Sequence, residues 1–281
     1  IQDTYKWTSD AGVLSATGGV RANFWTFNNE LLVSPRISVA WLPAWEKDYS
    51  FRFATGLYYQ SPFYKEIRDT VSDGLGNVKV ELNKNIKAQR SVQFVLGGDH
   101  HFRAWGRPFK FTTEAYLKLA DRVISYSVDN VNVTYSGEND AKAYTAGIDF
   151  KLFGELVPGT DSWINFSLMN SKEDIIGDSY IAHTYDDDGN ILSSKTVYPG
   201  WVSRPNEQRY SFSMMFQDYF PNNPKYKVHL KTILSDGLPF SAPNSVQYRS
   251  AYRAPADGRV DIGASRVVVS GSDKIMDQKW L

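Results

Sequence analysis

The sequence lacks cysteine, net charge and long hydrophobic runs. Without cysteine the chain forms no disulfide, which suits passage through an oxidising periplasm but is also common in cytosolic proteins. The 31 basic and 31 acidic residues cancel, so charge gives no reason to expect nucleic acid or another strongly charged partner. Apolar runs are only a few residues long, as at 267–269, and fall far short of the roughly 20 residues of a transmembrane helix.

Motifs for catalysis and metal binding are also missing. There is no Gly-x-Ser-x-Gly, His-Glu-x-x-His or phosphate-loop motif, so we expect neither an enzyme nor a cofactor. The run 186–190, Asp-Asp-Asp-Gly-Asn, resembles a calcium loop, but the glutamate of the EF-hand pattern is absent and an exposed turn is favoured. His100 and His101 are neighbours on one predicted strand, point to opposite faces and therefore do not form a metal pair.

The sequence is instead rich in strand-like segments and aromatic residues. Aromatic residues make up 15% of the chain. The alternation of apolar and polar residues predicts eleven strands and the start of a twelfth near 279–281. The predicted strands cover residues 1–8, 13–27, 35–43, 50–59, 88–102, 109–122, 142–153, 162–171, 208–217, 226–235 and 259–268.

The connections between these strands alternate between two lengths. Short connections are predicted at 9–12, 44–49, 103–108, 154–161, 218–225 and 270–278. Mostly long connections are predicted at 28–34, 61–87, 123–141, 172–207 and 236–258, and two of them contain Asp-Gly turn signals, at 72–74 and 188–190. Such alternation is typical of a membrane barrel, whose two ends meet different compartments.

Apolar and charged residues fall on opposite faces of the predicted strands. In the strand 109–122, Phe111 and Leu117 share one face, whereas Lys110 and Glu114 share the other. A charge on a lipid-facing position costs about 2–4 kcal/mol, whereas a charge that faces a wet lumen costs little. Arg266 is an exception, since strict alternation places it on the apolar face, and a bulge or snorkelling would accommodate it.

Strand length and aromatic placement agree with a membrane span. Ten residues at ~3.3 Å each and a ~45° tilt rise roughly 23 Å, close to the ~25 Å apolar band of an outer-membrane barrel. Aromatic residues flank the short connections, as Trp41, Trp45 and Tyr49 do at one of them. We therefore predict an all-β, antiparallel transmembrane β-barrel, with a soluble β-sandwich as the alternative.

Several stretches of the sequence carry a resemblance to a known family. They are Ser-Pro-Arg at 34–36, Gly-Leu-Tyr-Tyr-Gln-Ser-Pro-Phe-Tyr-Lys-Glu at 56–66, Lys-Ala-Gln-Arg-Ser at 87–91, Trp-Gly-Arg-Pro-Phe-Lys-Phe-Thr-Thr-Glu at 105–114, Gly-Ile-Asp at 147–149, Arg-Pro-Asn-Glu-Gln-Arg at 204–209, Phe-Gln-Asp-Tyr at 216–219, Gly-Leu-Pro-Phe at 237–240 and Arg-Val-Asp-Ile-Gly at 259–263. In their order and spacing the chain resembles the C-terminal half of the barrel of TonB-dependent outer-membrane receptors of the Bacteroidetes type.

The resemblance implies a 22-stranded barrel in the outer membrane of a Gram-negative bacterium, blocked by an N-terminal plug. It implies partners: the TonB–ExbB–ExbD complex, outer-membrane lipids and lipopolysaccharide, a nutrient ligand, and optionally a surface lipoprotein. No plug, TonB-contacting segment or final strand is recognisable, and both ends of the sequence look cut. Residues 1–281 are therefore expected to form a partial barrel domain of a longer transporter.

Aromatic residues near the long connections are the candidate ligand contacts. Tyr58, Tyr59, Phe63 and Tyr64 lie where a strand enters a long connection, and Tyr198 and Trp201 lie in the longest one. They could stack on a sugar or an aromatic ligand, but an outer aromatic girdle or loop packing explains them as well. Two other functions stay open: a passive porin or structural barrel, and a soluble β-sandwich binding module such as a lectin.

Overall fold

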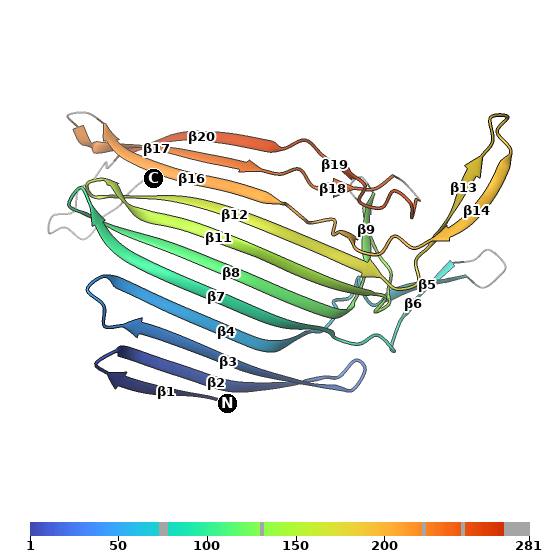
Figure 1. Cartoon of the computed structure of the whole chain (residues 1–281), viewed down its shortest axis with the longest axis horizontal. Coiled ribbons are helices and arrows are strands. Elements are labelled where there is room, and N and C mark those ends of the chain that lie inside the picture. Colours follow the sequence, from blue (N-terminus) through green and yellow to red (C-terminus); the bar gives the residue numbers. More distant parts are fainter. Residues whose placement is uncertain (73–77, 130–131, 221–222, 243–244, 267–281) are drawn as a thin grey trace.

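The protein is all-β and is dominated by one large antiparallel sheet (Figure 1). The computed structural model describes residues 1–72, 78–129, 132–220, 223–242 and 245–266. The eleven strands along the sheet follow one another in chain order, so each strand between the two edges hydrogen-bonds to the strand before it and the strand after it. The eleven predicted strands are thereby confirmed, whereas the predicted twelfth strand and the short connection at 270–278 lie outside the described residues.

The strands of the large sheet are mostly longer than predicted. They are β1 (Gln2–Ser9), β2 (Gly12–Trp25), β3 (Glu30–Pro43), β4 (Asp48–Gln60), β7 (Gln89–Ala104), β8 (Arg107–Val123), β11 (Ala141–Val157), β12 (Thr160–Ile175), β16 (Tyr210–Phe220), β17 (Asn223–Ser235) and β20 (Asp257–Arg266). A two-residue strand, β15 (Val202–Ser203), pairs with the end of β12. Among the described residues, β1 and β20 are the two edges of the sheet.

The two ends of the sheet differ, as Figure 1 shows. Tight turns join the strands at one end, on the left of the view, and four small hairpins gather at the other. We call the second the hairpin end. Its hairpins are β5 (Arg68–Ser72) with β6 (Val78–Leu82), β9 (Tyr126–Asp129) with β10 (Asn132–Tyr135), β13 (Tyr180–Tyr185) with β14 (Ile191–Val197), and β18 (Pro239–Phe240) with β19 (Tyr252–Arg253).

The predicted turn signals fall within these hairpins. The signal at 188–190 joins β13 to β14, where Gly189 adopts a φ of 84° that favours glycine. The signal at 72–74 begins at Ser72, the last residue of β5, and its residues 73–74 lie outside the described part of the chain; β5 and β6 pair as an antiparallel hairpin would.

One predicted long connection, at 28–34, is wrong. The β2–β3 pairing runs without a break from Gly12 with Pro43 to Trp25 with Glu30, so the turn comprises only residues 26–29. Pro35 suggested a strand start, because proline cannot donate a hydrogen bond within a sheet. The pairing between β3 and β4 ends at Arg36, so no hydrogen bond to β4 is required at Pro35. β3 therefore continues through Pro35, where it pairs with β2 alone.

Apolar packing is concentrated at the hairpin end. One buried cluster contains Ile67, Ile86 and Ile124, with Trp25 and Phe27 packed against it. A second contains Val123, Ala141 and Ala143 at the adjoining ends of β8 and β11. In the described part of the chain, these two clusters anchor the hairpin end, while many large apolar side chains along the strands are exposed or only partly buried.

Candidate functional site

One face of the large sheet is apolar across all eleven strands. The register places Phe53 of β4 beside Leu96 of β7, and Leu96 beside Ala115 of β8, and the same rows continue toward both edges. Many of these side chains are uncovered: Leu96 is 60% exposed and Ile262 is 82% exposed. Apolar patches beyond a few hundred Å² are rare on monomeric soluble proteins and mark surfaces that contact a membrane or a partner.

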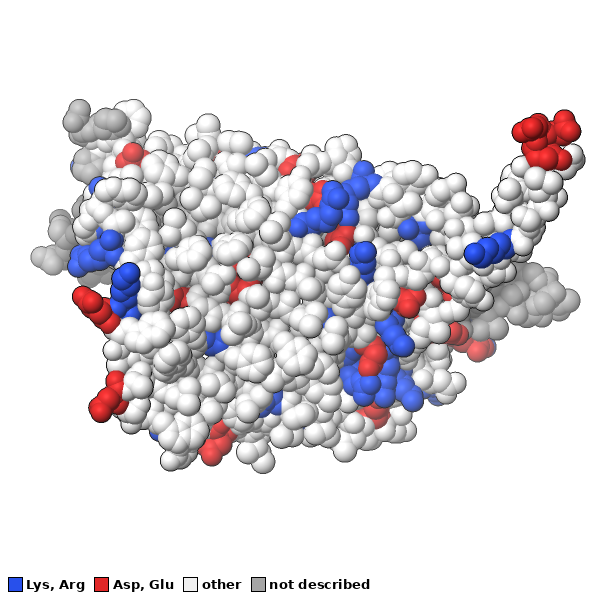
Figure 2. Space-filling model, viewed as in Figure 1, with Lys and Arg blue, Asp and Glu red and all other residues white. Residues whose placement is uncertain are grey.

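Charges on this apolar face lie mostly near the strand ends. The middle of the sheet is largely white in the space-filling view, and charged side chains gather toward the ends of the strands (Figure 2). Near the hairpin end, Arg90 and Asp121 form an ion pair with 2.9 Å between Nε and Oδ1. Asp3 is an exception, because it pairs with Gly18 in the middle of β2, although it lies near the start of the shorter edge strand β1.

Arg266 lies on the apolar face, as strict alternation predicts. The β17–β20 pairing places it opposite Tyr226 with no register shift from Asp257 onward, so no bulge turns it inward. Its guanidinium lies 5.1 Å from the centre of the Tyr226 ring, near the tight-turn end. A cation over an aromatic face at the end of a strand is compatible with snorkelling toward an interface.

Aromatic rings cluster on the apolar face at the tight-turn end. Trp41, Trp45, Tyr49 and Phe51 form one group around the β3–β4 turn, with ring centroids 5.4–6.2 Å apart in successive pairs. His100 stacks on Tyr49 at 4.1 Å and extends this group onto β7. Rings with polar tips are suited to the boundary between an apolar phase and water.

The next turn presents an aromatic residue in an unfavourable backbone conformation. Trp105 has a φ of 53° and is 78% exposed, and its ring meets Phe109 edge-on at 5.9 Å. A bulky residue in the left-handed region costs roughly 1–2 kcal/mol relative to glycine. Gly106 beside it also has a positive φ, of 75°, so both residues of this two-residue turn adopt the conformation that a tight hairpin favours, and the indole is exposed at this end.

The opposite face of the sheet is polar and carries a network of ion pairs. Asp99 of β7 is almost buried and accepts hydrogen bonds from Arg52 at 2.6 Å and from Thr112 at 2.6 Å, with Lys110 3.3 Å away. Arg52 also reaches Glu114 at 3.3 Å. These side chains come from three adjacent strands, so the network ties β4, β7 and β8 together on the polar face.

A second ionic cluster holds the segments of the hairpin end. Asp236 accepts a 2.6 Å hydrogen bond from Arg209 and a 3.0 Å hydrogen bond from Arg253, which also binds Glu207. The hydrogen bond from Arg209 keeps the pKa of Asp236 below its ordinary value. Glu207 and Asp236 are buried, so they depend on these arginines for their charge balance.

The predicted ligand contacts separate between the two faces. Tyr58 lies on the polar face beneath Arg36, whose guanidinium is 4.5 Å from its ring centre. Tyr59 has the opposite parity on β4 and lies opposite Arg90, on the apolar face. Phe63 packs edge-on against Tyr135 at 5.3 Å, and Tyr64 is exposed with Arg68 5.8 Å above its ring.

The two residues of the longest connection do not join this group. Trp201 contacts Tyr144 at 5.1 Å, and Tyr144 belongs to the apolar row of β11. Tyr198 is 69% exposed and has no aromatic neighbour among the described contacts. Of the six predicted residues, Tyr58 and Tyr59 line the same hollow, Tyr58 from the polar face, and the ligand roles of all six stay predictions.

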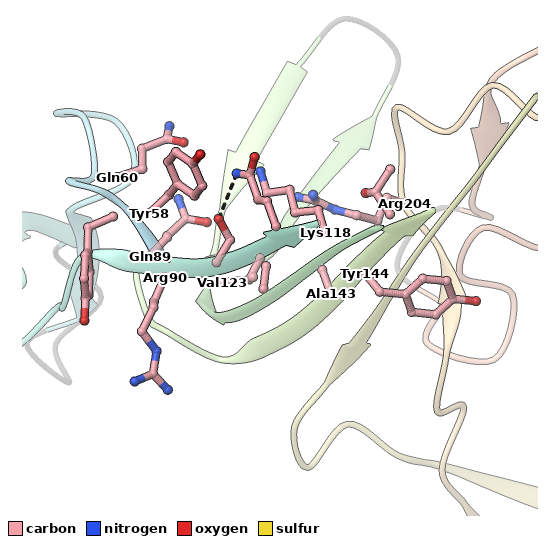
Figure 3. A pocket seen from close by; sticks show the side chains of 14 residues that line it. Tyr58, Gln60, Gln89, Arg90, Lys118, Val123, Ala143, Tyr144 and Arg204 are labelled. Atoms are coloured by element: carbon pink, nitrogen blue, oxygen red, sulfur yellow. Dashed lines mark hydrogen bonds between the residues drawn. The ribbon is translucent and has the colours of Figure 1, made fainter. Parts of the chain in front are cut away.

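This hollow lies on the polar face near the hairpin end and has a volume of about 150 Å³. Figure 3 shows Tyr58, Gln60, Gln89, Lys118 and Arg204 around it, with Arg90 directed away. Sequence analysis missed Lys118 and Arg204. The alternation of β8 places Lys118 on the polar face already at the level of the sequence, but no local signal connects it with Arg204, which lies far along the chain.

The run 186–190 forms an exposed turn, as predicted. The Asp186 carboxylate accepts hydrogen bonds from the backbone N–H groups of Asp188 and Asn190, and these bonds, led by that from Asn190, lower its pKa. His100 and His101 point to opposite faces: His100 stacks on Tyr49, and His101 lies 3.5 Å from Asp48. Within the described ranges, no group of three or more His, Asp or Glu side chains is arranged to hold a metal ion.

Comparisons with models of protein families, with curated proteins and with solved structures found no match. In the part of the chain that the structure describes, no helix is long and apolar enough to cross a membrane. The function is therefore inferred from the geometry of the two faces and of the hairpin end.

Proposed function

We propose that this chain forms part of the wall of an outer-membrane transporter in a Gram-negative bacterium. One observation carries this proposal: the apolar face and the polar face extend across eleven strands, the few charges on the apolar face lie mostly near the strand ends, and many of the apolar side chains are exposed. Lipid acyl chains suit the apolar face, and a hydrated lumen suits the polar face. The tight turns then face the periplasm, and the hairpin end faces the cell exterior.

A β-sandwich agrees less well with the same observation. A sandwich packs the apolar face of one sheet against a second sheet about 10 Å away. The small sheets at the hairpin end have two strands each, and large side chains such as Leu96, Leu168 and Val260 are exposed on the apolar face. The membrane wall accounts for this exposure, and the sandwich does not.

The resemblance to TonB-dependent receptors supplies the transport mode. In this proposal the hairpin end binds a nutrient, and the TonB–ExbB–ExbD complex drives import through the rest of the protein. The sheet contributes a polar surface, on which the ion pairs of Asp99 connect neighbouring strands. At the hairpin end, the ion pairs of Asp236 and Glu207 hold the connecting segments together.

Uptake by intact cells tests this function. Cells that carry or lack the gene receive isotope-labelled oligosaccharides, peptides and iron chelates, with and without an uncoupler of the proton gradient. Uptake that requires both the gene and the gradient supports the proposal. Uptake that persists with the uncoupler would indicate a passive porin, and no gene-dependent uptake of any compound would contradict transport.

A further inference from the structure

Two hollows on the polar face meet at Tyr58. The first is the hollow of about 150 Å³ between β4, β7, β8 and β11 (Figure 3). The second, of about 560 Å³, lies beside it over β1 to β4 and is lined by Arg21 and Arg36. Tyr58 lines both hollows, so they form one continuous surface near the hairpin end, which we call the Tyr58 surface.

The Tyr58 surface is basic although the chain as a whole is neutral. Arg21, Arg36, Arg90, Lys118 and Arg204 line it, and no aspartate or glutamate does. The Arg90 side chain is directed away and pairs with Asp121. Arg204 is paired with Glu173 at 3.1 Å. In the described part of the chain, Arg21, Arg36 and Lys118 have no carboxylate partner.

This lack of partners contrasts with other basic residues of the wall. Arg52 binds Asp99 and Glu114, Arg90 binds Asp121, and Arg122 binds Glu30. Arg36 instead rests on Tyr58, and the Arg21 side chain donates to the neutral amide oxygen of Asn23. Their positive charges are therefore available to a ligand.

The backbone holds the two arginines close together. Arg36 pairs with Gly19 across the β2–β3 ladder, and Arg21 lies two residues beyond Gly19 on the same face. Diagonal neighbours of this kind are about 7–8 Å apart at the backbone, within reach of one ligand group. Gly56 provides the seat for Arg36, because a Cβ there would lie 3.0 Å from the Arg36 Cγ and 3.2 Å from the Tyr58 ring.

The remaining lining is neutral and polar. Gln89, Gln93 and Thr145 surround Lys118 in the first hollow, and Thr17 and Ser38 lie near the arginines in the second. Guanidinium groups bind carboxylate, sulfate and phosphate through paired hydrogen bonds, while amides and hydroxyls bind neutral polar groups. The surface thus combines sites for separated anionic groups with hydrogen-bonding positions between them.

We propose that the Tyr58 surface is a binding site for a small ligand that carries two or more oxyanion groups, such as carboxylates or phosphates. The inference rests on the proposed function, because it takes the polar face to line the lumen that the ligand enters. It adds the chemical class of the ligand. Arg21 and Arg36 hold one anionic group, Lys118 with Arg204 holds another, and Tyr58 lies between them.

Equilibrium binding to the whole purified protein tests the proposal. The probes are citrate for carboxylates, tripolyphosphate for phosphates and maltotriose as a neutral control, each at low and high salt. The test variants are Arg36→Gln and Lys118→Gln. Lys151→Gln is the matched control, because Lys151 lies on the same face, outside the two hollows and beside Glu114 and Asp149.

We expect citrate or tripolyphosphate to bind more tightly than maltotriose, and salt to weaken the binding. Each test variant should weaken it roughly tenfold, and Lys151→Gln less than about twofold. Binding of citrate alone would assign the site to carboxylates, whereas binding of both probes would assign it to oxyanions in general. Equal binding of all three probes, or an equal loss in Lys151→Gln, would overturn the proposal. The proposed function is measured separately, by uptake and by lipid contact of the apolar face.

Discussion

Placing an arginine at neighbouring positions of β7 should have opposite consequences, because the two side chains point to different faces. Leu96 lies on the apolar face between Phe53 and Ala115. Val95 lies on the polar face between Ala54 and Tyr116. The pair Leu96→Arg and Val95→Arg therefore changes the same strand, at nearly the same depth, by the same side chain.

The expected difference follows from the cost of a charge in lipid. An arginine that faces lipid near the middle of the membrane costs about 2–4 kcal/mol, which is roughly a thirty- to several-hundred-fold change in the ratio of folded to unfolded protein. On a hydrated lumen face the cost should stay below about 1 kcal/mol. Guanidinium titration of the whole protein in phospholipid vesicles, followed by tryptophan fluorescence, measures both variants against the unchanged protein.

The same pair separates a membrane wall from a water-soluble sheet. Leu96 is 60% exposed, and if that exposure were to water its replacement by arginine would change the unfolding free energy by only about 0.5 kcal/mol. A loss under about 1 kcal/mol for Leu96→Arg in vesicles, or equal losses for the two variants, would refute the assignment of the two faces.

Three further predictions concern the hairpin end. The hydrogen bond from Arg209 lowers the pKa of Asp236, so the ionised Asp236 carboxylate stabilises the fold at neutral pH, and this stabilisation is lost as the pH falls below the ordinary carboxyl pKa near 4. Limited proteolysis should therefore cleave 236–256 faster in acid, and Asp236→Asn should remove that pH dependence. Burial raises the pKa of Glu66, so the ionised Glu66 carboxylate destabilises the fold at neutral pH, the opposite of Asp236. Glu66→Gln should therefore slow proteolysis around 61–67 at neutral pH, and faster cleavage would count against this reasoning. Gly56→Ala should displace the Arg36 side chain and weaken citrate or tripolyphosphate binding several-fold, while the midpoint of unfolding in guanidinium chloride shifts little. Unchanged binding would show that the contact between Gly56 and Arg36 is unimportant for the ligand.

Most of the large sheet could be predicted from the sequence because its strands alternate with a period of two. That pattern locates each strand and separates its faces, as Leu117 and Lys118 on β8 illustrate. The turn at 26–29 was missed because Pro35 suggests a break, and only the pairing of β3 shows why the strand tolerates it. The alternation of residues along the sequence thus locates the strands, whereas their ends depend on how far each strand pairs with its neighbours.

The candidate site was less predictable, because its residues come from distant parts of the chain. Tyr58 and Tyr59 look equivalent as an aromatic pair, although alternation places them on opposite faces. Lys118 and Arg204 line one hollow only because β8 and the segment after β15 meet at the hairpin end. The period of apolar and polar residues does not predict that these two segments are close, since their proximity depends on the order and register of the whole sheet.

Accessibility of nitroxide labels along β7 tests the central claim most directly. The chain contains no native cysteine, so single cysteines at positions 91–96 can each carry a label without competition from other sites in the chain. In vesicles of the whole protein, we predict that even positions are relaxed by oxygen, which concentrates in lipid, and odd positions by a water-soluble nickel complex, with a period of two. Labels that show no such alternation, or even positions that are relaxed mainly by the nickel complex, would contradict a sheet with one face in lipid and the other in water.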